Sequence, residues 1–285
     1  MKIIVPMAGT GQRFVDKGYV DPKPIIRVNG KRIIEYILDM FSDDDEFVFI
    51  CNNDHIDNTN LGEILYELKP DSKIYFMPQH KLGPVHTVKT IYDEIDDDEE
   101  VIISYCDNPY LWDRDDFMKY IRENELDGCV LTHTGFHPHT LANTKMAFVK
   151  DKDGLLEEIK EKECYTDNPM NEHASTGIYY YRKGSYVKKY FEEMVERDIN
   201  YNGEYYVTLV YNLLVEDGLK VGYYDTPYVT VFGTPDEVEN FEAWATILKG
   251  NQVNSEEDLV KCYNYWKGYH ESSEQRRKPA VLSRR

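Results

Sequence analysis

The sequence opens with a glycine-rich turn that is followed by two cationic residues. An apolar run over residues 2–7 leads into Ala8-Gly9-Thr10-Gly11-Gln12-Arg13-Phe14, and Lys23 stands between two prolines further on. Glycines allow backbone N–H groups to approach phosphate oxygens closely, and Arg13 and Lys23 add positive charge. The turn is therefore predicted to bind a polyphosphate. An ordinary strand-turn-helix corner with a stray arginine is the alternative interpretation.

Two common phosphate-binding motifs do not fit this turn. The P-loop requires Gly-Lys-Ser/Thr at its end, whereas Gln12 and Arg13 follow Gly11. The dinucleotide-binding fingerprint requires a third glycine three residues after the second, and Phe14 occupies that position. The predicted polyphosphate site therefore belongs to a different class.

A carboxylate at the end of a second apolar run is the next candidate. Residues 101–105 have the composition of a buried strand, and Cys106 and Asp107 follow it. Mg²⁺ prefers one or two carboxylates together with phosphate oxygens and water. Asp107 is therefore the first choice as the ligand of Mg²⁺ at a polyphosphate site, with Mn²⁺ able to substitute. A turn or helix-capping role before Pro109 is the alternative.

Three histidines, His133, His137 and His139, stand close together in the next part of the sequence. A zinc site would require a fourth donor at regular spacing, so metal binding is the weaker interpretation. Imidazoles can donate hydrogen bonds to a phosphorylated small molecule, and His137 and His139 are predicted to bind such a substrate. A polar surface loop without a ligand stays open.

The composition limits the partners and the compartment. The 285 residues carry a formal net charge of -19, whereas nucleic acids and anionic membranes bind to a basic face, so neither is expected as a partner. The five scattered cysteines contain no C-x-x-C pair, which indicates reduced thiols, and Cys106 is expected to pack rather than react. No apolar run could span a bilayer, and strand-like residues begin at Lys2, so we expect a cytoplasmic protein.

The elements that position these residues alternate between strands and helices in the first half of the chain. Five segments have the pattern of strands: 3–7, 47–51, 73–77, 101–105 and 128–133. Three segments have apolar residues at helical spacing: 34–41, 61–68 and 88–95. This alternation favours a mostly parallel sheet with helices on both faces, in which ligands bind at the carboxyl ends of the strands. The glycine-rich turn and Asp107 both fall at such ends.

The second half is richer in short strands. Strands are expected in a hairpin over residues 146–160 and at 177–182, 219–224 and 228–232. Helical spacing occurs at 187–194 and 207–214, and a last helix is expected after Gly233, with Thr234 as its N-cap and Pro235 in its first turn. Residues 251–285 are expected to form a C-terminal helix, over 255–269, and a flexible polar tail.

Together, the G-x-G-x-R-F…P-K-P string, the strand-end Asp107 and the final Gly-Thr-Pro turn resemble the sugar-phosphate nucleotidyltransferase family. Members of that family join an NTP to a phosphorylated small molecule and release pyrophosphate. The resemblance runs from Met1 to about Leu248 and implies an α/β fold of the nucleotidyltransferase, or GT-A-like, type. That fold has a Rossmann-like, mostly parallel mixed sheet flanked by helices and a smaller β-rich acceptor region. It implies one domain over 1–250, with an NTP-binding half at 1–135 and an acceptor-binding half at 136–250.

The resemblance also implies roles for individual residues. Arg13 would hold the β- and γ-phosphates, Lys23 the α-phosphate, and Lys162 of the Glu161-Lys162 pair the acceptor phosphate. The other residues expected to contact the nucleotide are Met7, Ala8, Gly9, Thr10, Gly11, Gln79, Gly83 and Cys106, of which Gln79 and Gly83 would read the base. The other residues expected to contact the acceptor are His137, His139, Glu172, Thr176, Gly177 and Glu204. A phosphate monoester is already nucleophilic at neutral pH, so positioning and charge neutralisation would carry catalysis.

One position departs from the family pattern. Several relatives carry a second metal-binding Asp two residues before the Gly of the Gly-Thr-Pro turn, and this position is Val231 here. A second carboxylate must come from elsewhere, with Asp225 and Glu204 as candidates, or the site relies on Asp107 and the substrate phosphates.

Two strings indicate a narrower resemblance. Residues 135–139 and 169–175 resemble the capsule-locus branch, in particular enzymes that join CTP to L-glutamine phosphate and make CDP-L-glutamine for capsular phosphoramidate. This implies CTP, or another NTP, and a phosphorylated small molecule as partners, with a sugar 1-phosphate as the alternative acceptor. The oligomeric state stays open, a homo-oligomer included.

Two other function classes stay open. A glycosyltransferase could use a nucleotide-sugar on the same architecture, but such enzymes usually carry a D-x-D motif, which Asp107-Asn108-Pro109 lacks. A regulator could bind an NTP without turnover.

Overall fold

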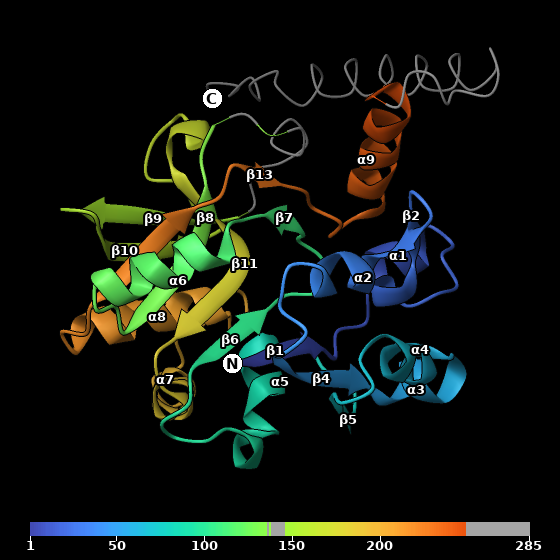
Figure 1. The fold of residues 1–285 in the computed structure, drawn as a ribbon, viewed down its shortest axis with the longest axis horizontal. Helices are drawn as coiled ribbons and strands as arrows, with labels where there is room; N and C mark the ends of the chain where they lie inside the picture. The colour runs from blue at the N-terminus through green and yellow to red at the C-terminus, as the bar shows by residue number, and fades with distance from the viewer. Residues whose placement is uncertain (136, 138–145, 249–285) are drawn as a thin grey trace, which may run out of the picture.

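The computed structural model describes residues 1–135, 137 and 146–248, which surround one nine-stranded sheet (Figure 1). Its strands are β1 (Lys2–Met7), β4 (Glu46–Asn52), β5 (Lys73–Met77), β6 (Val101–Ser104), β8 (Gly128–His133), β9 (Ala147–Lys152), β10 (Leu155–Glu161), β11 (His173–Tyr181) and β12 (Val221–Asp225). The order β10-β9-β11-β6-β1-β4-β5 forms the main path, and β8 pairs with both β11 and β12. The C-terminal helix and tail expected over residues 251–285 lie outside the described residues, and so does His139.

The sheet is mixed and divides into two zones. In the first half of the chain β1 pairs in parallel with β4 and β6, and β4 pairs in parallel with β5. In the second half β11 runs antiparallel to β6, β8 and β9, while β12 pairs in parallel with β8. This confirms the predicted Rossmann-like mixed sheet, and β11 joins the two zones beside β6.

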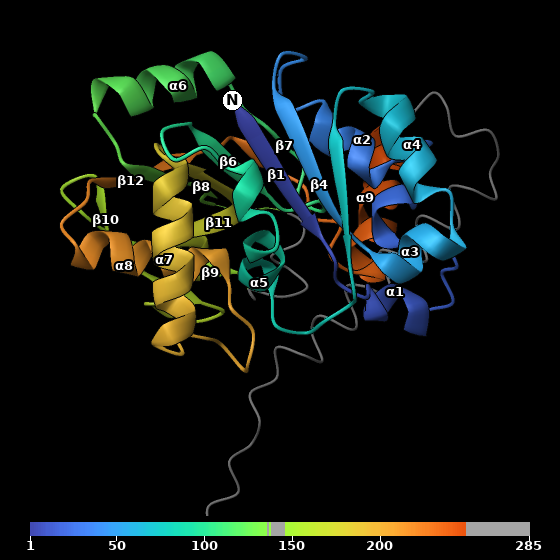
Figure 2. The same ribbon diagram turned by 90° about the horizontal axis from the view of Figure 1, so that it is seen from below.

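Helices cover both faces of the sheet. They are α1 (Gln12–Asp16), α2 (Ile33–Leu38), α3 (Asn53–Asn58), α4 (Leu61–Leu68), α5 (Pro84–Lys89), α6 (Arg114–Glu123), α7 (Gly184–Glu196), α8 (Val207–Glu216) and α9 (Pro235–Leu248). Figure 2 shows α5, α7 and α8 grouped together, away from α2 and α4. Within the described residues, no helix is both long enough and apolar enough to cross a membrane.

Alternating side chains of the strands feed two hydrophobic cores. Ile3 and Val5 of β1 pack in the core that α2, α4 and α6 cover, whereas Ile4 packs in the core under α5, α7 and α8. Successive side chains of a strand point to opposite faces, so a strand buried on both faces is apolar on both, as β1 is from Ile3 to Met7. Packing in the two cores therefore fixes the pairing of β1 with β6, and with it the position of their carboxyl ends.

Most predicted boundaries agree with the structure, and the differences have local causes. The helix expected over 88–95 ends at Lys89, and a 3₁₀ turn, η2 (Tyr92–Glu94), follows, although Ile91 and Ile95 are buried as the spacing required. The strand expected at 177–182 begins earlier, at His173, because its first residues pair with β8 and β9 before a register shift. That shift spans Gly177, whose φ is +89°.

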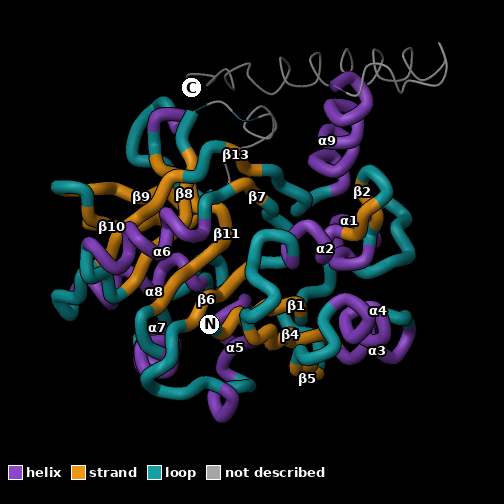
Figure 3. The backbone as a smooth tube through the Cα atoms, viewed as in Figure 1, coloured by secondary structure: helices purple, strands orange, loops and turns teal. Residues whose placement is uncertain are grey.

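Two short 3₁₀ turns and two short strand pairs complete the frame near the site. The 3₁₀ turn η1 (Lys23–Ile25) carries Lys23, and η4 (Pro169–Asn171) precedes β11. Two small two-stranded sheets lie outside the main sheet: β2 (Arg27–Val28) with β3 (Lys31–Arg32), and β7 (Tyr110–Leu111) with β13 (Tyr228–Val229). Figure 3 shows β7 and β13 side by side, and their pairing ties the segment before α9 to the segment after Asp107.

Candidate active site

Two adjoining pockets open at the carboxyl ends of β1 and β6. The turn pocket, of about 290 Å³, is lined by residues 8–10 of the glycine-rich turn and by the loop before α5. The main pocket, of about 490 Å³, lies between Arg13, the β10–β11 region and the start of α9. Together they are large enough for two small substrates. Their position agrees with the rule that ligands bind at the carboxyl ends of parallel strands.

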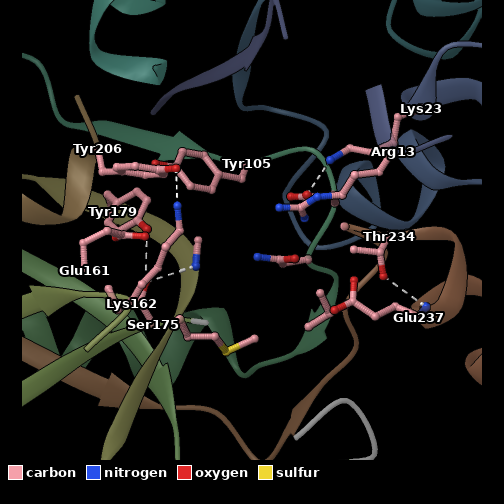
Figure 4. A pocket seen from close by; sticks show the side chains of 17 residues that line it. Arg13, Lys23, Tyr105, Glu161, Lys162, Ser175, Tyr179, Tyr206, Thr234 and Glu237 are labelled. Carbon is pink, nitrogen blue, oxygen red and sulfur yellow. Dashed lines mark hydrogen bonds and ion pairs between the residues drawn. The ribbon is translucent and has the colours of Figure 1, made fainter. Parts of the chain in front are cut away.

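Four residues line both pockets and mark the place where they meet: Lys23, Tyr105, Asp107 and Tyr206. Lys23 Nζ lies 2.5 Å from Asp107 Oδ2. Burial lowers the pKa of Lys23, but the Asp107 carboxylate outweighs it, so the pKa is raised overall. Lys23 is therefore a fixed ammonium at the boundary between the pockets. Figure 4 shows Lys23 and Arg13 across the main pocket from Lys162.

The glycine-rich turn has the local geometry that its sequence predicts. Gly11 has a φ of +62° and precedes α1, and the N–H of Phe14 donates to its carbonyl oxygen at 2.8 Å. Ala8, Gly9 and Thr10 line the turn pocket, whereas Met7 packs in the core. Arg13 is exposed and lines the main pocket.

Gly83 is fixed by a close approach of two loops. Its φ is +89°, and a Cβ atom there would lie 2.7 Å from the backbone nitrogen of Tyr205. The N–H of Tyr205 donates to the carbonyl of Leu82 at 2.9 Å, and that of Val85 donates to the carbonyl of Tyr205 at 3.2 Å. The wall of the turn pocket is thereby attached to the segment that carries Glu204. Gln79, by contrast, is exposed and does not line the pocket.

Cys106 lines the turn pocket as a buried thiol. Burial raises its pKa to about 11, so the thiol stays protonated at neutral pH. A protonated buried thiol is a poor nucleophile, in agreement with the packing role expected for it.

Lys162 lies in the main pocket within an aromatic frame. Its Nζ donates to Tyr206 Oη and lies 4.2 Å from the centre of the Tyr206 ring and 5.0 Å from that of Tyr201. Tyr206 Oη in turn donates to Glu204 Oε2. The ammonium of Lys162 is thus held by rings and a phenol oxygen, which positions it for an anionic group entering the pocket.

Several residues of the main pocket were absent from the sequence-based set. Glu161 is 8% exposed, accepts a hydrogen bond from Thr208 Oγ1 at 2.7 Å, and has its pKa raised by burial. Ser175 Oγ lies 3.1 Å from Tyr179 Oη, and both side chains line the pocket. The only signal in the sequence for Glu161 is its place beside Lys162 in a strand whose side chains alternate.

Gly177 also lines the main pocket, where β11 passes close to the residues after β6. A Cβ atom on Gly177 would lie 2.9 Å from Asn108 Nδ2, and the N–H of Tyr105 donates to the Gly177 carbonyl at 2.9 Å. The glycine lets the second zone of the sheet approach the strand end that carries Asp107.

Other predicted residues lie outside the two pockets. Thr176 is buried and donates to the Leu131 carbonyl at 3.2 Å. Glu172 accepts from the N–H groups of Tyr165 and Thr166 at 2.8 and 2.7 Å, so it holds the loop before β11. The structure does not bring either of them into contact with the pocket interior.

The histidine segment and Asp225 form a separate cluster. The rings of His133 and His137 lie 4.5 Å apart. Asp225 accepts a hydrogen bond from Thr132 Oγ1 at 2.7 Å and lies 3.0 Å from His173 Nδ1. None of these residues lines either pocket, so the structure does not bring Asp225 to Asp107. Within the described residues, no group of three His, Cys, Asp or Glu side chains could hold a metal ion.

A carboxylate that the sequence analysis did not select lies at the edge of the main pocket instead. Glu237, in the first turn of α9, lines this pocket together with Thr234 and Gly233. Its side chain is 8% exposed. The sequence Thr234-Pro235-Asp236-Glu237 has the pattern of a capping box, and in the sequence this segment was interpreted only as the start of a helix, with Thr234 as its N-cap.

Comparison with known sequences identifies a family and several relatives. Residues 3–164 match the MobA-like NTP transferase domain. The bifunctional protein GlmU of Clostridioides difficile strain 630 is 26% identical over 228 residues, which cover 78% of this chain and 46% of the relative. That of Staphylococcus carnosus strain TM300 is 27% identical over 242 residues, which cover 82% of this chain and 50% of the relative. The chain thus spans about half the length of these curated relatives.

Solved structures share the fold. A nucleoside-diphosphate-sugar pyrophosphorylase from Vibrio cholerae RC9 superposes with a TM-score of 0.68 at 22% identity, over 84% of this chain and 99% of that one. The inositol-1-phosphate CTP transferase from T. maritima superposes with a TM-score of 0.64 at 16% identity, over 84% and 94% of the two chains. At these identities the likeness extends to the fold alone.

Proposed function

Because this chain belongs to the MobA-like NTP transferase family, we propose that it is a nucleotidyltransferase that joins an NTP to a phosphorylated small molecule and releases pyrophosphate. The observation that carries the proposal is the pair of pockets that meet at Lys23 and Asp107. One pocket is bounded by the glycine-rich turn and the other by Lys162 among its tyrosine rings. Two anionic substrates can therefore approach each other beside the ammonium group of Lys23.

In this proposal the nucleoside binds in the turn pocket, against residues 8–10 and the Gly83 loop. These residues belong to the proposed NTP-binding half at 1–135. The phosphates of the NTP extend past Lys23 toward Arg13. Lys23 contacts the α-phosphate and Arg13 the β- and γ-phosphates in this arrangement. Backbone N–H groups and two cations suit a polyphosphate because its charge is the same in every NTP.

The acceptor is placed in the main pocket, with its phosphate on Lys162 and the rest of the molecule near Glu161 and Ser175, in the proposed acceptor half at 136–250. An oxygen of the acceptor phosphate attacks the α-phosphorus in line. The bond between the α-phosphorus and the oxygen that bridges to the β-phosphorus breaks, and pyrophosphate leaves with that electron pair. The attacking oxygen is already deprotonated, so the protein acts by positioning and by neutralising charge.

The pocket fits the divalent cation that this family of folds uses. Asp107 Oδ2 faces a gap above Gly233 that a Cβ atom would fill, and a carboxylate there is the donor type that Mg²⁺ prefers. Asp107 would hold Mg²⁺, or Mn²⁺ in its place. When bound, the ion offsets the phosphate charge and stabilises the leaving pyrophosphate.

Within this reaction class, we propose CTP and L-glutamine phosphate as the substrates, with CDP-L-glutamine for capsular polysaccharide as the product. The resemblance of residues 135–139 and 169–175 to the capsule-locus branch supports this choice. A carboxylate and phenol oxygens around the acceptor position suit hydrogen bonds from an amino acid's ammonium or amide. A sugar 1-phosphate is the second candidate, because the same oxygens also accept hydrogen bonds from sugar hydroxyls and several relatives are named for sugar nucleotides.

The test is pyrophosphate release with Mg²⁺ from CTP, UTP, GTP and ATP, each paired with L-glutamine phosphate and with a panel of sugar 1-phosphates. Release from CTP with L-glutamine phosphate alone is the expected result. Release with a sugar 1-phosphate instead retains the reaction class and replaces the acceptor. If no pair releases pyrophosphate, and a nucleotide-sugar gives nucleoside diphosphate, the chain is a glycosyltransferase and the proposal is wrong.

A further inference from the structure

We propose that Glu237 supplies the second carboxylate of the metal site, opposite Asp107, and so takes the place that Val231 cannot fill. The inference rests on the proposed function, because it concerns the cation that the reaction uses. It is carried by the convergence of three side chains on the space above Gly233.

This convergence is visible at one point. A Cβ atom placed on Gly233 would lie 3.3 Å from Glu237 Oε2, 3.4 Å from Asp107 Oδ2 and 3.7 Å from Val231 Cγ1. Two carboxylate oxygens therefore face the same small volume from opposite elements, β6's continuation and α9. Because position 233 is glycine, no side chain fills the space between them.

The turn that carries Glu237 is attached to Asp107 by the main chain. The N–H of Phe232 donates to the carbonyl oxygen of Asp107 at 2.7 Å, and the N–H of Glu237 donates to the Thr234 carbonyl at 3.2 Å. The pairing of β7 with β13 also holds this segment, a few residues before Phe232. Backbone hydrogen bonds thus fix the two segments from which the Asp107 and Glu237 side chains extend.

The charge at this point favours a further cation. Asp107 and Glu237 are both within electrostatic reach of one ammonium, that of Lys23, and both line a pocket whose proposed substrates are anionic. A divalent cation between the two carboxylates would be attracted by both of them and would in turn attract the phosphates.

Other pocket carboxylates in the described part of the chain are engaged differently. Glu161 is hydrogen-bonded to Thr208 and held toward its neutral form by burial. Glu204 accepts from Tyr206 Oη and lines the turn pocket rather than the gap above Gly233. Glu237 is the carboxylate that shares a point with Asp107.

The competing interpretation is that Glu237 only completes the capping box with Thr234. Glutamine serves in a capping box as well as glutamate does, but it lacks the charge that a hard cation requires. Glu237→Gln therefore separates the two roles, because it keeps the cap and removes the charge. Glu239→Gln is the matched control, since Glu239 lies on the same helix, is exposed and does not line the pocket.

The experiment measures Mn²⁺ binding to the full chain by the loss of the free-ion electron paramagnetic resonance signal, without nucleotide. Glu237→Gln should weaken Mn²⁺ affinity about 10–100-fold, on the scale of losing one metal-site partner, and Asp107→Asn at least as much. Glu239→Gln should stay within about twofold of the wild type, and thermal melting checks that each variant is folded. Equal affinity for the wild type and Glu237→Gln, or a wild type that binds no Mn²⁺, overturns the inference.

A gain-of-function variant tests the geometry independently. Since Val231 Cγ1 faces the same point, Val231→Asp in the Glu237→Gln background should restore Mn²⁺ affinity to within about threefold of the wild type. Failure to restore it in a folded protein contradicts the shared site. Pyrophosphate release by the wild type with unchanged Mg²⁺ dependence in Glu237→Gln would remove this inference and leave the proposed function standing, whereas Mn²⁺ binding without pyrophosphate release from any substrate pair would do the reverse.

Discussion

The turn pocket and the main pocket are built from different parts of the chain. The turn pocket is lined by the small residues 8–10 of the glycine-rich turn and by the Gly83 loop, beside the residues that it shares with the main pocket. The wall of the main pocket is a set of side chains that contact one another, such as Lys162 with Tyr206 and Ser175 with Tyr179. The difference follows from the proposed substrates. A triphosphate is the same in every NTP and can be bound by backbone N–H groups and a few cations, whereas an acceptor must be chosen by its shape.

Lys23 stands where the two pockets meet, so its loss gives the largest expected effect. Lys23→Ala should reduce kcat about 10²–10³-fold, the scale of removing one preorganised contact to the charge of the transition state. The measurement is steady-state pyrophosphate release with both substrates saturating. Lys17→Ala is the control, because Lys17 is an exposed lysine of the same segment that pairs with Asp236 at 3.4 Å. A Lys23→Ala enzyme of wild-type activity would show that the boundary is not where the chemistry occurs.

The comparison also explains what the sequence could predict. The turn pocket is local in the chain: glycines, Arg13 and the end of β1 are consecutive, and hydrophobic periodicity correctly placed the strands that bring Asp107 beside them. These features depend on short-range geometry that residue types determine. The fold class followed from the same periodicity, because alternating strands and helices allow few arrangements.

The main pocket could not be predicted to the same extent because it is assembled from distant segments. Glu161 and Tyr206 come from different elements, and nothing in either local sequence indicates that they share a pocket. Asp225 shows the opposite case. It ends a strand, as Asp107 follows one, but β12 pairs with β8 at the other side of the sheet, where Asp225 meets Thr132 and His173. Pairing order, which the sequence does not state, decides which strand ends meet.

Acid should destabilise the fold through a buried imidazole at the end of β8, that of His133. Burial, together with His137, lowers the pKa of His133 from its ordinary value of 6.5 to about 4, although Asp225 opposes the change. The neutral form is the stable one in the fold, so this stabilisation is present above pH 6.5 and is lost as the pH falls toward 4. Over that range the free energy of unfolding should fall by about 2–3 kcal/mol.

Urea unfolding of the wild type and of His133→Gln between pH 5 and pH 7.5 measures this loss. The variant should show a shallower dependence on pH, while His86→Asn, at a half-buried histidine of α5, should keep most of the wild-type slope. Identical slopes in the wild type and His133→Gln would mean that other groups titrate in this range and that His133 is not the acid-sensitive group.

Replacing Lys162 tests whether the main pocket binds only the acceptor and not the NTP. Lys162→Ala should lower kcat/KM for the acceptor by about 10–100-fold, as expected for losing a charged hydrogen bond of about 1.5–3 kcal/mol, with little change in the KM for the NTP. Lys160→Ala is the matched control, since Lys160 lies at the end of β10 shortly before Lys162 but outside the pocket, near Glu163 and Tyr165. If Lys162→Ala raised the KM values of both substrates equally, the two pockets would act as one functional site.

Tyr206→Phe gives the smallest expected effect and the sharpest comparison, because Tyr206 lines both pockets. The variant keeps the ring that lies 4.2 Å from Lys162 Nζ and removes the phenol oxygen that links Lys162 to Glu204. Losing one uncharged partner of this kind costs about 0.5–1.5 kcal/mol, so the KM for the acceptor should rise about two- to tenfold. The KM for the NTP should change less than twofold if the link serves to position Lys162. If the KM for the NTP rises as much as that for the acceptor, the phenol oxygen positions Glu204 as well, and the turn pocket depends on the side-chain network of its neighbour.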